Sequence, residues 1–139
     1  MRWDGSEGRS ILVFALQGRV GGMDRSTGEV RWLREFGDGG EVFLVVTDEV
    51  VLASSDAPEL WCLDYTTGKA LWQSPTTGRG RATIVLDRDQ VVVAKGGYVN
   101  CFDRTGKHLW SNLLKGYGTG RIALGFPGNV AQADDQGSQ

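Results

Sequence analysis

The sequence predicts an all-β chain made of repeated four-stranded units, and three observations lead to this prediction. A phrase occurs three times: residues 24–32 read DRSTGEVRW, residues 64–72 read DYTTGKALW, and residues 103–110 read DRTGKHLW. The phrases recur about every 40 residues, a period typical of stacked or radially arranged β units. Glycine is abundant, with 21 of 139 residues against only 3 prolines, which indicates many tight turns between short strands.

The second and third units each contain four short stretches of alternating or β-branched residues. We expect strands over residues 41–47, 49–54, 59–64 and 69–74, and again over 81–86, 90–95, 98–103 and 107–112. In the repeated turns, an aspartate side chain can accept backbone N–H groups while the glycine adopts a positive φ angle. Four antiparallel strands in about 40 residues make up one blade of a β-propeller.

The first unit lacks its inner strand, because residues 11–16, 18–24 and 29–36 match only the second, third and fourth strands. We therefore divide the chain into a short leader (1–10), about three blades (11–126) and a flexible tail (127–139). Propellers have four to eight blades, so we predict a C2 homodimer that closes a six-bladed ring, although a fragment of a longer protein is the alternative. The predicted closure strand, which would join the partner's first unit, consists of Arg121, Ile122, Ala123, Leu124, Gly125 and Phe126.

The repeated motif of an apolar residue, Asp-x-x-Thr-Gly and a later tryptophan resembles the blade repeat of the PQQ-like (quinoprotein-type) β-propeller family. The resemblance spans roughly residues 10–126 and identifies the chain as a short member with three repeats. It implies that the tryptophan of each outer strand packs between blades, which agrees with a large apolar side chain at one fixed place per unit. The residues predicted to dock the blades are Trp32, Trp72, Trp110, Asp24, Gly28, Asp64, Gly68, Asp103 and Gly106.

The resemblance does not extend to the chemistry of the quinoprotein dehydrogenases, which hold PQQ and calcium with adjacent cysteines, a cluster of oxygen ligands and a catalytic aspartate. Cys62 and Cys101 are far apart in this sequence and share one repeat position with Gly22, which predicts a small buried slot. No local calcium-binding loop is present, and no partner can be named for His108. We predict no catalytic, cofactor or metal residues, no cofactor and no enzyme activity; a PQQ-dependent oxidoreductase fragment is the third-ranked function.

The remaining features favour a protein-interaction scaffold. A net charge of −2 gives no general attraction to nucleic acid or to a membrane, and the first residues do not resemble a signal peptide, so we expect a cytoplasmic protein. Its expected partners are a second copy and other proteins. The alternative function is binding of a small ligand or anion at the channel mouth, where Glu41, Arg81 and Arg121 open successive inner strands.

Overall fold

The computed structural model describes residues 8–36, 40–118 and 120–133, and its regular elements are all β strands. Within these ranges, no helix has the length and apolar character needed to cross a membrane. The strands form a three-stranded sheet, two four-stranded sheets and a hairpin, with antiparallel pairing throughout. This confirms the predicted all-β fold of four-stranded units.

The three larger sheets follow the chain in order, and we call them the first, second and third blades. The first blade consists of β1 (Ile11–Leu16), β2 (Arg19–Asp24) and β3 (Val30–Glu35). The second consists of β4 (Phe43–Val46), β5 (Val50–Ser54), β6 (Glu59–Asp64) and β7 (Ala70–Pro75). The third consists of β8 (Ala82–Asp87), β9 (Gln90–Lys95), β10 (Tyr98–Asp103) and β11 (His108–Asn112).

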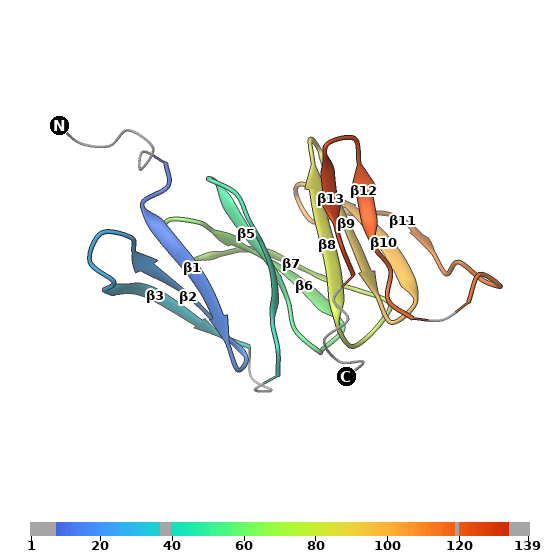
Figure 1. Cartoon of the computed structure of the whole chain (residues 1–139), viewed down its shortest axis with the longest axis horizontal. Helices are drawn as coiled ribbons and strands as arrows, with labels where there is room; N and C mark the ends of the chain where they lie inside the picture. Colours follow the sequence, from blue (N-terminus) through green and yellow to red (C-terminus); the bar gives the residue numbers. More distant parts are fainter. Residues whose placement is uncertain (1–7, 37–39, 119, 134–139) are drawn as a thin grey trace.

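The blades pack face to face in a row, as Figure 1 shows from the blue first blade to the yellow and orange third blade. Successive residues of a strand point to opposite faces of its sheet, and the second blade uses both faces for packing. Val51 and Ala53 face the first blade, whereas Leu52 lies in the core shared with the third blade. All three side chains are at most 1% exposed, so burial between blades supplies the hydrophobic stabilisation.

A short hairpin covers part of the outer face of the third blade, where the sequence predicted an inner strand and a tail. Its strands are β12 (Leu124–Phe126) and β13 (Asn129–Ala131), joined at Gly128, whose φ of 72° suits a tight turn. The Asn129 amide anchors the hairpin by donating hydrogen bonds to the Leu86 carbonyl (2.8 Å) and the Asp87 carboxylate (3.1 Å).

Two predicted boundaries therefore need correction. Of the residues predicted to form a closure strand, 121–123 precede β12, and residues 129–131 form a strand where the sequence predicted a flexible tail. The apolar side chains of the hairpin segment explain the difference, because Ile122, Leu124, Phe126 and Ala131 pack on the third blade of their own chain. Most of the predicted leader (1–7) and the end of the tail (134–139) lie outside the described residues.

Candidate functional site

The first two repeated tryptophans join neighbouring blades. Trp32, which is 8% exposed, donates from Nε1 to the Tyr65 carbonyl of the second blade at 3.1 Å. Trp72 makes the equivalent bond to the Arg104 carbonyl of the third blade at 2.9 Å. In each case the turn glycine of the next blade lies against the indole ring: a Cβ atom built on Gly68 would sit 2.4 Å from Trp32, and one on Gly106 would sit 2.6 Å from Trp72.

Trp110 occupies the same repeat position but is 45% exposed. No blade of the described chain presents a repeated turn to it.

The residues opposite the three tryptophans on the neighbouring strands are Gly22, Cys62 and Cys101. A Cβ atom on Gly22 would lie 2.4 Å from Trp32 Nε1, so the repeat position must be small because it faces the indole. Burial raises the pKa of the Cys62 thiol to about 11, which leaves it unreactive near neutral pH.

The aspartates of the repeated turns act as acceptors for their own backbone. Asp24 Oδ1 accepts the Ser26 N–H at 2.8 Å, and Asp103 Oδ1 accepts the Thr105 N–H at 2.8 Å. The side-chain hydrogen bond from Ser26, supported by Arg31, holds the pKa of Asp24 well below its usual range. The side-chain hydrogen bond from Thr105 is the main cause of the lowered pKa of Asp103.

Acidification should therefore weaken the fold. Because the pKa of Asp24 and of Asp103 is lower in the folded state, the unfolded chain binds more protons, and this stabilisation is present above about pH 4 and lost as the pH falls through the folded values. We expect the urea midpoint to decrease from pH 5 to pH 3, and the decrease to be smaller in the Asp24→Asn, Asp103→Asn double variant. An equal decrease of the urea midpoint in the parent and in the double variant would show that Asp24 and Asp103 do not cause the pH dependence.

Lys95 ties the third blade to the second through a buried ammonium group. Its side chain is 1% exposed although it ends β9. Nζ donates to Ser54 Oγ at 2.7 Å, to the Ser55 carbonyl at 2.6 Å and to the Ala57 carbonyl at 2.5 Å, at the end of β5 and in the turn that follows it. A buried charge needs this degree of hydrogen bonding, so Lys95 is a structural cation directed away from solvent.

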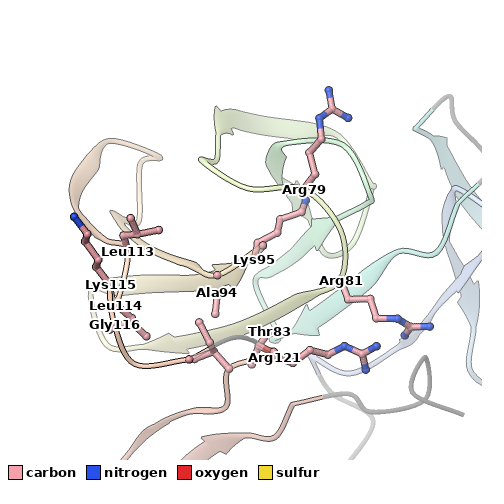
Figure 2. Close-up of a pocket in the computed structure, with 15 residues that line it drawn as sticks. Arg79, Arg81, Thr83, Ala94, Lys95, Leu113, Leu114, Lys115, Gly116 and Arg121 are labelled. Carbon is pink, nitrogen blue, oxygen red and sulfur yellow. The ribbon is translucent and has the colours of Figure 1, made fainter.

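A basic pocket lies beside the start of β8, and Figure 2 shows its lining. Its volume is about 610 Å³, and its walls include the ends of β9 and of the segment that leads to β12. No aspartate or glutamate is among its described lining residues. The cationic residues that line it are Arg79, Arg81, Lys95, Lys115 and Arg121.

The structure brings two of the three predicted channel-mouth residues into this pocket and pairs the third with one of them. Arg81 and Arg121 both line it, and their side chains extend toward the same side in Figure 2. Glu41 bonds Arg81 across the second and third blades, with Nη2 and Oε1 2.8 Å apart. The charge of Arg81 is thus partly compensated. Arg79, which the sequence marks only by its flanking glycines, and Lys115, which carries no sequence signal, also line the pocket but were not among the predicted channel-mouth residues.

The described residues do not fit PQQ or calcium. The two cysteines are buried and lie in different blades, and no group of three acidic, histidine or cysteine side chains among the described residues could hold a metal ion. His108 Nε2 lies 2.6 Å from Ser111 Oγ, but that hydroxyl donates its single proton to Asn100 Oδ1 at 2.8 Å. The imidazole therefore donates to the serine and does not activate it as a nucleophile.

The packing of these antiparallel units gives the chain a β-propeller fold, and its repeats are of the PQQ-like type. The model of the family described as outer membrane protein assembly factor BamB matches residues 16–134, and the chain belongs to this family. No curated protein matches the chain.

Solved structures share the fold. BamB from Moraxella catarrhalis is 23% identical with a TM-score of 0.60, and the match covers 74% of this chain and 33% of BamB. The quinohemoprotein alcohol dehydrogenase from Comamonas testosteroni is 20% identical, with a TM-score of 0.61 and coverage of 74% and 19%. A europium-containing methanol dehydrogenase is 19% identical, with a TM-score of 0.59 and coverage of 73% and 22%. The chain thus spans a third or less of the length of these propellers.

Proposed function

We propose that this chain is a non-catalytic interaction module that binds an acidic segment of a partner protein at the basic pocket, and that its blades work inside a closed ring completed by a second copy. The chain belongs to the family that is described as outer membrane protein assembly factor BamB, and this membership supports a role in protein interaction. The observation that carries the proposal is the pocket itself, which gathers cationic side chains and no described acidic residue in a chain of net charge −2.

Three of the cationic side chains in the pocket are accessible to an acidic partner. Arg79, Lys115 and Arg121 are exposed, and no salt bridge joins any of them to a described residue. Guanidinium groups bind carboxylates through two parallel hydrogen bonds. The neighbouring Gly97 leaves the backbone open to close approach, since a Cβ atom there would meet nothing within 4 Å. An extended acidic segment suits this arrangement better than a single small ion because the side chains of Arg79, Lys115 and Arg121 extend in different directions, as Figure 2 shows.

A labelled hexaglutamate peptide is the probe that tests the proposal. We expect the full chain to bind it in fluorescence anisotropy, and the Arg79→Gln, Arg121→Gln double variant to bind about fivefold to tenfold more weakly. Binding should also weaken as salt is added, since exposed charges are screened. Arg34→Gln is the matched control because Arg34 is an exposed arginine on β3, outside the pocket.

The outcomes separate the candidate functions. Equal affinity in the double variant and in the Arg34→Gln control, or no binding by the parent chain, would overturn the acidic-partner proposal. Competition by citrate or phosphate at concentrations far below those of simple salt screening would favour the second candidate, a small anionic ligand, for which the 610 Å³ pocket has room.

A further inference from the structure

The contact between neighbouring blades has two halves, and one example of each half has no counterpart among the described residues. The first half is a tryptophan of an outer strand, and the second is the repeated turn of the next blade. Within the chain, Trp32 contacts the turn of the second blade and Trp72 contacts the turn of the third. In both contacts Nε1 donates to the carbonyl of the residue directly after the turn aspartate.

The unmatched turn is the one at residues 24–28 in the first blade. It has the conformation of the turn that Trp32 contacts, because the Gly28 N–H donates to the Asp24 carbonyl at 2.8 Å and the Gly68 N–H donates to the Asp64 carbonyl at 2.8 Å. The φ angles of the two glycines are 80° and 75°. A Cβ atom on Gly28 would meet nothing within 4 Å, whereas one on Gly68 would meet the Trp32 ring.

The unmatched tryptophan is Trp110. Its side chain is 45% exposed, in contrast to 8% for Trp32. The blades that carry these two free halves also expose apolar side chains. On the first blade, Leu12 and Leu16 are 57% and 62% exposed; since Ile11, Val13 and Ala15 pack toward the second blade, these leucines lie on the opposite face. Leu113 near Trp110 is 48% exposed.

We propose that Trp110 of one copy docks on the 24–28 turn of a second copy, with its indole over Gly28 and Nε1 bonded to the Arg25 carbonyl. This proposal rests on the ring closure in the proposed function and names its contact. Each copy supplies one tryptophan and one turn, so two copies can make the contact twice and close a symmetric ring. Exposed apolar faces of this kind mark interaction surfaces.

The hairpin at the end of the chain has to change when the second copy docks. β13 pairs with β12 and contacts β8, so it occupies the position that the partner's β1 would take. The first blade lacks an inner strand and leaves β1 at its edge. If β13 yields this position, β12 can serve as the inner strand of the partner's first blade. Such an exchange replaces the pairing of β12 with β13 by a pairing of β12 with the partner's β1.

Light scattering after size exclusion tests the contact on the full chain. We expect the parent protein to have the mass of two chains and Trp110→Ala to have the mass of one. Tyr117→Ala is the matched control, since Tyr117 is an aromatic residue of the same blade's C-terminal loop, 84% exposed and outside the repeat; this variant should remain a dimer. Circular dichroism should show that both variants keep the strand content of the parent.

A second variant alters the other half of the contact. Asparagine tolerates a positive φ, so Gly28→Asn should fold and should lose the dimer because its side chain fills the space meant for the indole. A mixture of Trp110→Ala with Gly28→Asn retains one intact contact per pair and should recover a two-chain species. A monomeric parent, or a dimer unaffected by both substitutions, would overturn the docking; a monomer that still binds hexaglutamate would overturn it while leaving the acidic-partner site in place.

Discussion

Lys95→Met is expected to be among the most destabilising single substitutions in the chain, with a loss of about 3 kcal/mol in the free energy of unfolding. Methionine keeps most of the apolar stem but removes the ammonium group. Ser54 Oγ and the Ser55 carbonyl then lose the ammonium as a donor, whereas the Ala57 carbonyl keeps the Glu59 N–H at 2.8 Å. An unsatisfied buried acceptor costs about 1–3 kcal/mol, and the relief from burying a charge offsets only part of that sum.

Lys115→Met is the control for this prediction. Lys115 lines the same basic pocket but is exposed, and surface substitutions usually change stability by no more than about 0.5 kcal/mol. Urea unfolding followed by circular dichroism measures both variants. Equal midpoints for Lys95→Met and Lys115→Met would show that the Lys95 ammonium contributes little to joining the blades.

The repeated elements could be predicted from the sequence because their causes are local. Alternation of side chains, the Asp-x-x-Thr-Gly turn and the glycine positions all act within a few residues, and the predicted strands differ from the observed ones mainly at their ends. The 41–47 strand, for example, is observed over Phe43–Val46, and the 69–74 strand over Ala70–Pro75. The fold class followed from the same signals because a period near 40 residues, combined with four β-type stretches in each unit, indicates a propeller blade.

The candidate site could be predicted only in part because its contacts join distant segments. Lys95 appears in the sequence as an ordinary polar end of a strand, and its acceptors in the preceding blade cannot be found by local pattern. The charge compensation of Arg81 by Glu41 likewise depends on two inner strands lying side by side. The β13 strand was missed because three residues carry little periodic signal, although the Pro127-Gly128 pair is a turn signal that could have indicated the hairpin.

Gly106→Ala should destabilise the protein by about 2–5 kcal/mol, the sum of two costs. Gly106 has a φ of 91°, and an L-residue in this region costs about 1–2 kcal/mol. The added methyl would also lie 2.6 Å from the Trp72 ring and 3.0 Å from Ser74 Oγ, and overpacking of this kind costs about 1–3 kcal/mol. The ring cannot simply withdraw, because its Nε1 bonds the Arg104 carbonyl of the same turn.

Gly97→Ala separates the two costs, because Gly97 has a similar φ of 87° but its Cβ atom would meet nothing within 4 Å. Only the conformational cost of about 1–2 kcal/mol should remain in this variant. The difference between the two free energies of unfolding, obtained from urea titrations, then measures how strongly Trp72 holds the third blade against the second. A difference near zero would mean that the indole moves aside freely, and the repeated tryptophan would then contribute little to blade docking. A difference in the free energy of unfolding of about 1 kcal/mol or more would show that the indole packs tightly on the glycine and does not move aside. The proposed Trp110 contact between two copies requires the same tight packing.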